Sequence, residues 1–226
     1  MRFENTEVWG FKHAIRGMRN PKDSWDRSDS SFDGELIIGP NDMKLMKALI
    51  SGGSEHRKFL RQIFISVDIT APFYWWKEFD TYKVGTVANS CSTMHKLDAY
   101  PITLDNFETD DFHQDLILNG HAIDNITIEP YINSFIHFCE LLRQKYLETK
   151  DKRYWKELVR WLPNGWLQKR TITMNYENVF SMIHQRSNHK QNEWSGKDDP
   201  DLTNFIAWAH TLPYADELLF NMQPAT

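Results

Sequence analysis

The chain has 226 residues, of which 41% are hydrophobic and 25% charged, so it is long enough and apolar enough to bury a substantial core. Its net charge of −5 argues against a protein whose main partner is a nucleic-acid backbone, because such proteins cluster Lys and Arg. Two cysteines are too few for a structural zinc site built from Cys pairs, and no apolar run approaches the roughly 20 residues that cross a bilayer. We therefore expect a cytoplasmic protein with no membrane or nucleic-acid partner.

Short elements are predicted before residue 54. A strand is expected at 6–11 and a helical turn at 14–21, which Pro21 ends. Ser, Asp, Gly and Pro dominate 22–40, which is typical of a loop. Asn41 can cap a helix that runs through Ile50 and stops at the glycine pair that follows.

The clearest strand of the sequence is predicted at 63–69, where apolar and polar residues alternate. Pro72 then stands where the first turn of a helix tolerates it, and 73–79 supplies bulky apolar residues for a buried helix. A Thr/Ser-rich turn is expected at 86–93. Residues 100–128 give mixed signals and predict a loop with a short helix.

Helices dominate the prediction after residue 130. The interval of three and four between apolar residues predicts an amphipathic helix over 131–146, and a second helix is expected at 151–161. A strand at 170–174 leads to Asn175, which can cap the next helix. A polar stretch and a helix with a break near Pro213 complete the chain. One α+β domain over 1–226 is the economical interpretation.

Familiar catalytic motifs are absent from the sequence. It holds no P-loop, no dinucleotide-binding Gly-rich turn and no H-E-x-x-H zinc motif. Cys91 and His95, four residues apart, could be half a metal site, a nucleophile with its base, or ordinary packed side chains. The spacing alone leaves these alternatives open, and we predict no metal site.

Hydrogen-bond donors gather directly after the helix that Asn175 caps. The run from Arg186 to Gln191 includes His189 and Lys190, and suits an anion or the edge of a pyrimidine. The alternative is a solvated helix end, where basic side chains balance the helix dipole.

Two segments in order resemble the flavin-dependent thymidylate synthases. In 67–97, a strand ending in Ala-Pro leads into an aromatic helix and then to the place of that family's R-H-R-x-x-S signature. Downstream, Leu162-Pro163, Thr173-Met174-Asn175 and 186–193 are similar to its L-P, T-[MV]-N and L-R-x(4)-A-Q-W-E elements. The early stretch 14–19 also resembles an A-x-R-x-A-R sequence of the family.

Much of the signature itself is substituted. An ungapped overlay sets Thr81, Tyr82 and Lys83 at R-H-R, Cys91 at the second Ser and Thr93 at the final Arg. The family's R-H-R supports flavin binding and its final Arg helps to hold the nucleotide phosphate. Lys83 can still meet a phosphate as a point charge, whereas the threonines cannot. Glu177 stands where the family has a flavin-binding Arg, which is a further loss of positive charge.

The resemblance implies a set of site residues. Arg186 would be the catalytic residue and would contact the pyrimidine. The implied cofactor-binding residues are Tyr82, Lys83, Asn89, Asn175 and His189. The implied substrate-binding residues are Glu78, Cys91, Ser92, Arg160 and Arg186.

The function that the resemblance implies is thymidylate synthesis. FAD would mediate transfer of a one-carbon unit from methylenetetrahydrofolate to C5 of dUMP, with NADPH as reductant, at sites between the subunits of a homotetramer. The implied fold is α+β with an antiparallel or mixed sheet and long helices. The 14% aromatic content, with nine Trp, suits such interfaces or planar ligands as well as a core. The alternatives are a flavoenzyme that modifies another pyrimidine nucleotide and a flavin-free, inactive binding or structural member of the fold.

Overall fold

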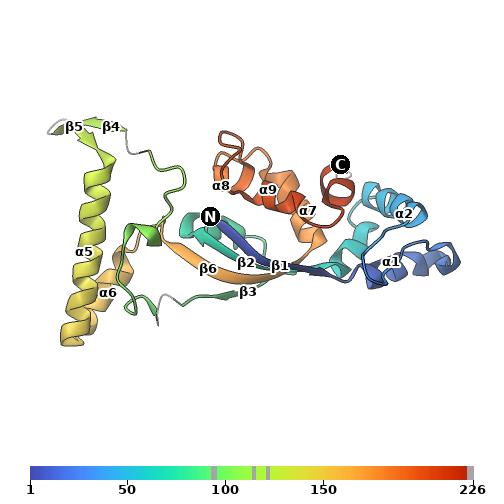
Figure 1. The fold of residues 1–226 in the computed structure, drawn as a ribbon, viewed down its shortest axis with the longest axis horizontal. Coiled ribbons are helices and arrows are strands. Elements are labelled where there is room, and N and C mark those ends of the chain that lie inside the picture. Colours follow the sequence, from blue (N-terminus) through green and yellow to red (C-terminus); the bar gives the residue numbers. More distant parts are fainter. Residues whose placement is uncertain (93–95, 114–115, 121–122, 223–226) are drawn as a thin grey trace. The chain divides into compact units, whose positions relative to one another are not determined.

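Residues 1–92, 96–113, 116–120 and 123–222 are described by the computed structural model (Figure 1). They divide into two compact units, each built from segments that are not consecutive in the chain. Unit 1 comprises Met1, Thr70–Phe79 and Ser90–Arg170, and unit 2 comprises Arg2–Ile69, Asp80–Asn89 and the chain from Thr171 onward. The expectation of a single domain over 1–226 stays a prediction.

Four strands form the main sheet in the order β1-β2-β6-β3. They are β1 (Arg2–Trp9), β2 (Phe64–Pro72), β3 (Val87–Ser90) and β6 (Leu167–Asn175). Along β2, Ile65, Val67 and Ile69 are fully buried while the polar residues between them are partly exposed, so the predicted alternation is confirmed. A second sheet pairs β4 (Ile117–Gly120) with β5 (Ile123–Thr127) antiparallel.

Unit 1 is built around a long helix and its neighbour. Its helices are α3 (Phe73–Phe79), α5 (Ile128–Thr149), α6 (Lys152–Trp161) and the short turn Leu104–Asn106. Helices α5 and α6 pack side by side (Figure 1). Between them and the preceding loop lies an apolar cluster that includes Phe107, Ile136, Cys139 and Leu158. Both helices, and α3, were predicted from the sequence and are confirmed.

Unit 2 carries the remaining helices. They are α1 (Phe11–Arg19), α2 (Pro40–Ser51), α7 (Tyr176–Arg186), α8 (Asn192–Ser195), α9 (Phe205–His210), three short 3-10 segments at Asn20–Lys22, Trp25–Arg27 and Arg57–Gln62, and a π-turn at Asp216–Phe220. The break near Pro213 is confirmed, because α9 ends before it and the π-turn follows it. Trp194, Tyr176 and Phe180 are among the fully buried large side chains of this unit.

Several predicted boundaries are wrong. The first strand is β1 at 2–9, not 6–11, and Phe11 begins α1 because the left-handed Gly10 (φ 101°) turns the chain between them. The turn expected at 86–93 contains strand β3, and the loop expected at 100–128 contains the β4-β5 hairpin. Short strands of this kind gain their stability from pairing with distant strands, which local sequence does not reveal.

The start of α2 shows a different error. Pro40, not Asn41, is its first residue, and the cap comes from a distant carboxylate. Asp29 accepts the backbone N–H groups of Asn41 and Asp42 at 2.9 and 3.1 Å. This side chain thus supplies the acceptor that the helix start needs, eleven residues before the helix begins.

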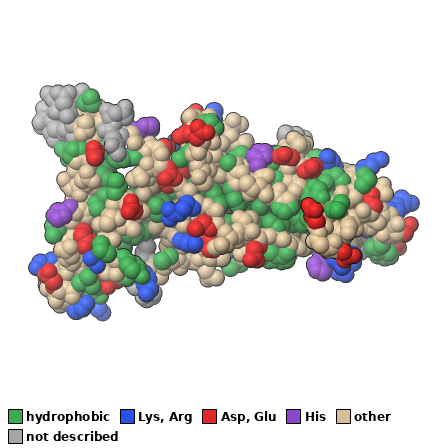
Figure 2. All heavy atoms as spheres, viewed as in Figure 1, with side chains coloured by type: hydrophobic (Ala, Val, Ile, Leu, Met, Phe, Trp, Pro, Cys, Tyr) green, Lys and Arg blue, Asp and Glu red, His purple; other side chains and the backbone are tan. Residues whose placement is uncertain are grey.

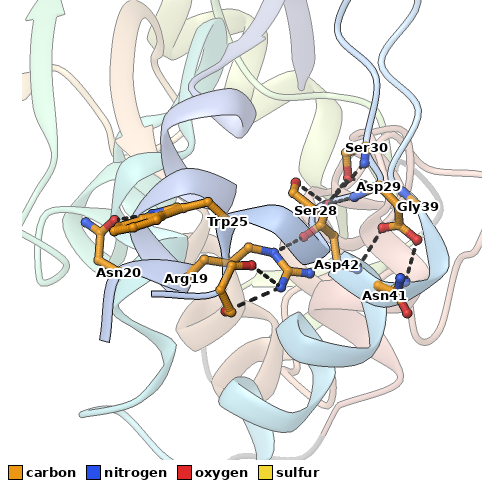
Figure 3. Close-up of polar contacts among 10 residues, drawn as sticks. Arg19, Asn20, Trp25, Ser28, Asp29, Ser30, Gly39, Asn41 and Asp42 are labelled. Carbon is orange, nitrogen blue, oxygen red and sulfur yellow. Dashed lines mark hydrogen bonds and ion pairs between the residues drawn. The ribbon is translucent and has the colours of Figure 1, made fainter. Parts of the chain in front are cut away.

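A buried ion pair ties α1 to α2 and to the loop between them (Figure 3). Arg19 Nε donates to Asp42 Oδ1 at 2.6 Å, and both side chains are almost inaccessible to solvent. Asp42 Oδ2 also accepts from Ser28 and Ser30 Oγ and from the Asp29 and Ser30 N–H groups. Burial raises the pKa of Asp42, but the hydrogen bonds from Ser30, Ser28 and Arg19 outweigh it and hold that pKa below its usual value.

We expect Asp42→Asn to lower the free energy of unfolding at neutral pH by about 3 kcal/mol, because Arg19 then loses its buried partner. A carboxylate with a lowered pKa stabilises the fold above its unfolded pKa of about 4, and this contribution is lost as pH falls through the folded pKa. The difference in unfolding free energy between Asp42→Asn and wild type should therefore become smaller below about pH 4. Urea unfolding across this pH range measures it.

Asp33→Asn is the matched control, since Asp33 is an exposed acid of the same loop. It should leave the unfolding free energy nearly unchanged. A gap for Asp42→Asn that stays constant with pH would contradict the role given to its charge.

Candidate functional site

The loop after α3 is fastened to the start of α7. Asn175 ends β6 and caps α7, its side chain accepting the Asn178 N–H at 3.0 Å while Asn178 Oδ1 accepts the Asn175 N–H at 3.1 Å. Asn178 Nδ2 then donates to the Val84 carbonyl at 2.7 Å. The cap predicted at Asn175 is confirmed, and it also anchors the loop that replaces the family signature.

Gly85 is required where this loop meets the cap. Its φ of +81° is a conformation that side-chain-bearing residues rarely adopt, and a Cβ there would lie 2.9 Å from Asn175 Nδ2. The Thr86 hydroxyl, from the next residue, donates to the Tyr82 carbonyl at 2.6 Å. The conformation of the loop is thus set before any ligand arrives.

The same loop brings Tyr82 to the other end of α7. Arg186 Nε donates to the Tyr82 hydroxyl at 2.9 Å, and that hydroxyl donates to Gln185 Oε1 at 2.9 Å. The Arg186 guanidinium lies 5.1 Å from the ring centroid of Trp194 and 5.5 Å from that of Tyr82. Two aromatic rings and a hydroxyl therefore fix the direction of a half-buried cation.

His189 and α8 extend this cluster. The His189 ring lies 6.5 Å from Trp194, and its Nδ1 accepts the Gln191 N–H at 3.2 Å, which puts the proton of the neutral ring on Nε2. Glu193 is buried, and burial raises the pKa of its carboxyl. Within the described part of the chain, Gln191 Oε1 is a buried acceptor with no hydrogen-bond donor. The group offers a cation, a ring donor and a carboxyl biased toward its protonated form.

Glu177, at the start of α7, forms an ion pair with Arg57. Arg57 Nε lies 3.0 Å from each Glu177 carboxylate oxygen, and the Arg57 guanidinium sits 4.7 Å from the Phe180 ring centroid. Both partners of the pair are largely buried. Arg57 thus places a guanidinium beside position 177, where the chain itself has a glutamate, and the Glu177 carboxylate balances its charge.

The remaining predicted cofactor residues are at the surface of unit 2. Lys83 is exposed in the loop, and Asn89 is exposed in β3. Of the predicted residues in this unit, the structure therefore joins Tyr82 directly to Arg186 and brings His189 to the same Trp194. Asn175 supports them through the loop that it anchors.

Four predicted substrate residues belong to unit 1. Glu78 is in α3, and Ser92 follows β3. Cys91 is exposed, and its backbone continues the pairing of β3 with β6 through an N–H donated to the Lys169 carbonyl at 2.8 Å. Arg160, on α6, is half exposed and pairs with Glu157 one turn earlier.

Cysteine chemistry differs between the two thiols. Cys139 is buried, and burial raises the pKa of its thiol to about 11, so it is a packing residue. Cys91 is exposed, contrary to the usual burial of a free cysteine. His95 and Thr93 lie outside the described residues, so the Cys91 and His95 alternatives stay open.

A cavity of about 620 Å³ in unit 2 was not predicted. Met18, Leu49 and Phe59 give it an apolar wall. Lys22 and Lys58 add cations, and Glu55, which pairs with Lys58 at 3.4 Å, adds a carboxylate. Its size is that of a typical small-molecule site. None of the predicted site residues lines it, and the only sequence signal near it was the 14–19 stretch, because three separate segments contribute to its wall.

Two kinds of feature are absent from the described ranges. No group of three or more His, Cys, Asp and Glu side chains there could hold a metal ion. No helix there is long and apolar enough to span a bilayer.

The fold was compared with known proteins. No family model and no curated protein sequence matches the chain. Among solved structures, it is similar to a flavin-dependent thymidylate synthase, ThyX, from Helicobacter pylori in complex with FAD and dUMP, with a TM-score of 0.63, 17% identity, and 99% and 100% of the two chains covered. A second structure of that enzyme with FAD and dUMP matches with a TM-score of 0.64 and 17% identity, with 97% of each chain covered.

A different enzyme has a similar fold. The UMP/dUMP methylase PolB from Streptomyces cacaoi, bound to 5-Br dUMP, matches with a TM-score of 0.56 and 13% identity, covering 98% of this chain and 96% of its own. The similarity extends over nearly the full length of all three structures, while identity is low throughout. The sequence resemblance is thereby confirmed at the level of architecture, and the chain has the α+β fold of the flavin-dependent thymidylate synthases.

Proposed function

We propose that the protein is a flavin-dependent enzyme that transfers a one-carbon unit to C5 of dUMP to make dTMP. Methylenetetrahydrofolate would donate the carbon, and NADPH would supply reducing equivalents. The enzyme would act in the cytoplasm as a homotetramer with sites between subunits. The proposal is supported by a fold shared with enzymes whose structures contain FAD and dUMP, and by residues 160–193, which keep much of that family's pattern.

The observation that carries the proposal is the fixed guanidinium of Arg186. Its contacts with the Tyr82 hydroxyl and with the rings of Tyr82 and Trp194 orient it before a ligand binds. A pyrimidine presents carbonyl oxygens that a guanidinium can approach in its own plane. Negative charge that develops on the ring during reaction at C5 would be stabilised by a cation that needs no reorganisation.

The residues present fit a flavin beside Trp194, where the rings of Tyr82 and His189 lie 6.3 and 6.5 Å from the Trp194 ring and suit contact with a planar ring system. The 620 Å³ cavity is a separate feature, since no predicted flavin contact lines it and its Lys58 pairs with Glu55. Tyr82, Lys83, Asn89, Asn175 and His189 remain the predicted contacts of the flavin elsewhere on unit 2. Bound FAD would supply the redox chemistry, and the protein would bind it, orient the pyrimidine and exclude water.

On unit 1, the proposed nucleotide contacts are Glu78, Cys91, Ser92 and Arg160. Ser92 and the exposed Cys91 lie next to each other in the chain and offer a hydroxyl and a thiol to a phosphate or sugar. Arg160 would have to exchange its exposed partner Glu157 for the ligand, which costs little because exposed ion pairs are weak.

A second candidate is a flavoenzyme that modifies another pyrimidine nucleotide. It is favoured by the similarity to a UMP/dUMP methylase and by the substituted phosphate-side residues Thr81 and Lys83. A flavin-free binding member of the fold is the remaining alternative, and FAD binding by the purified protein distinguishes it from the two enzymes.

We expect purified protein mixed with FAD to retain yellow colour through gel filtration, with an altered flavin absorption spectrum. The physical reason is transfer of the ring system from water to a partly apolar site. Absorbance of the protein peak near the flavin bands is the measurement. A peak that stays colourless after saturation with FAD would remove both enzyme hypotheses.

Arg186→Ala should weaken dUMP binding by about 10- to 100-fold, the cost of one charge-assisted hydrogen bond to a ligand. Arg186→Lys should bind dUMP with an affinity between those of wild type and Arg186→Ala, because it keeps the charge but loses the planar contact with Tyr82 and Trp194. Isothermal titration with dUMP measures both affinities. Arg61→Ala, at an exposed position, is the matched control. Equal dUMP affinity in wild type and Arg186→Ala would refute the site assignment.

Expression in a bacterium that lacks thymidylate synthase separates the two enzyme candidates. A thymidylate synthase should allow growth without thymidine, and Arg186→Ala should abolish that growth. Continued dependence on thymidine, in cells that contain the soluble yellow protein, would favour the enzyme of another pyrimidine nucleotide.

A further inference from the structure

A smaller cavity of about 230 Å³ lies beside α1, within unit 2. Its wall includes Lys12, His13 and Arg16 from one helix and Trp25 and Phe32 from the loop that follows. It shares no lining residue with the larger cavity, and it contains none of the residues to which a function has been given above. The proposed enzyme activity therefore leaves it unexplained.

Three basic side chains meet at this cavity. Lys12, His13 and Arg16 are all exposed, and Lys12 and Arg16 are one helical turn apart on the same face of α1. Among the residues that the structure describes, no carboxylate pairs with any of the three. Neighbouring like charges on a helix face repel each other, so an anion bound between them would relieve an unfavourable interaction.

Two aromatic rings complete the wall. Trp25 leaves 51% of its surface exposed, although its indole N–H is fixed by a 2.9 Å hydrogen bond to Asn20 Oδ1. Phe32 lies on the same cavity, with Lys12 Nζ 6.0 Å from its ring centroid. An exposed indole held in one orientation presents a flat apolar face on which another ring can stack.

Two contacts link Trp25 to the residues around the buried network: Asn20 holds the Trp25 indole, and Arg19 holds Ser24, which precedes Trp25 (Figure 3). Arg19 donates to Asp42 and to the Ser24 carbonyl, so its charge is used inside the protein and not in the cavity. Ser28, which lines the cavity, is held by the same Asp42 carboxylate at 2.8 Å. The aromatic and the polar parts of the wall are thus attached to one rigid base, which lowers the entropic cost of binding.

The size and the charge of the surroundings limit the ligand. A volume of 230 Å³ is below the usual 300–1,000 Å³ of sites for drug-sized molecules, so only a ring with one small substituent fits. Figure 2 shows blue and red side chains interspersed over the region of α1 and α2, and the chain has a net charge of −5. A nucleic-acid backbone needs a continuous basic surface, which this region does not offer.

We propose that this cavity binds a small planar anion, an aromatic ring that carries one phosphate or carboxylate. The ring would stack on Trp25, and the anionic group would contact Lys12 and Arg16, with His13 as a further donor. This site is separate from the nucleotide site proposed at Arg186, and it does not depend on it.

Fluorine NMR of protein labelled with 5-fluorotryptophan tests the proposal. Trp25→Phe identifies the Trp25 resonance, because only that signal is lost. Phenyl phosphate and orotate represent the phosphate and the carboxylate form of the ligand, and phenol and inorganic phosphate represent the two halves of the phosphate form. The titrations are made on wild type and on Arg186→Ala, so that binding at the other site cannot produce the result.

We expect phenyl phosphate or orotate to shift the Trp25 resonance saturably in both proteins, at lower concentration than phenol or inorganic phosphate alone. Whichever of the two binds more tightly identifies the anionic group. Replacing Lys12 and Arg16 together by Ala should weaken the binding at least 10-fold. The control, replacement of the exposed Lys44 and Arg61 by Ala, removes the same charge away from the cavity and should change nothing.

A Trp25 resonance that does not move with any probe would overturn the proposal. So would equal affinity for inorganic phosphate and for the complete ligands, because the ring would then contribute nothing. Undiminished binding after the loss of Lys12 and Arg16 would overturn it as well. A missing dUMP site at Arg186 would leave these results unaffected, so the two proposals fail independently.

Discussion

The reciprocal hydrogen bonds between Asn175 and Asn178 are the constraint on which the candidate site depends. They start α7, and α7 in turn sets the position of Arg186 ten residues later. The same pair holds Val84 and makes a side chain at position 85 unfavourable, so the loop that contains Tyr82 can follow one path. The start of α7 therefore determines the positions of both Arg186 and Tyr82.

A second feature of unit 2 is the ion pair of Glu177 with Arg57 at the start of α7. Glu177 introduces a carboxylate at the start of α7, and Arg57 supplies a guanidinium that the sequence order gives no reason to expect there. The net charge of the pair is zero, so the local field differs from that of an arginine at position 177. A ligand phosphate near this end of α7 would have to be held by other cations or by backbone N–H groups, as helix starts allow.

Local patterns predicted the long elements well. The alternation in β2 and the three-and-four spacing in α5 are signals of a buried face, and such signals persist in the folded chain because burial produces them. The predictions failed for β3 and for the β4-β5 hairpin, whose short strands depend on partners far along the chain. The capping of α2 by Asp29 was missed for the same reason, since the acceptor is not adjacent to the helix.

The candidate site was predictable only in part. Arg186, His189 and Asn175 were found because they follow one another in a segment that resembles a known pattern. The contact of Arg186 with Tyr82, which joins positions 104 apart, could not be read from spacing. The two cavities were missed because each is built from residues whose types are unremarkable in sequence and become a wall only after α1 and the loop beside it are folded.

The tryptophans show why composition alone could not decide between a core and a binding role. Trp75, Trp76 and Trp194 are essentially buried and account for much of the aromatic excess by packing. Among the exposed tryptophans, Trp9 stacks on Phe64 with ring centroids 5.9 Å apart, and the Trp161 indole donates to Glu157 within its own helix.

Trp25 differs from both of these, since its exposed ring forms part of the wall of a basic cavity. Large apolar side chains that are held rigid at a surface gain little stability from that position, because the ring stays in contact with water. The hydrogen bonds that hold the loop around Asp42 would form without a tryptophan at position 25. The proposed ligand, stacked on the exposed face of the ring, would account for a tryptophan at this position.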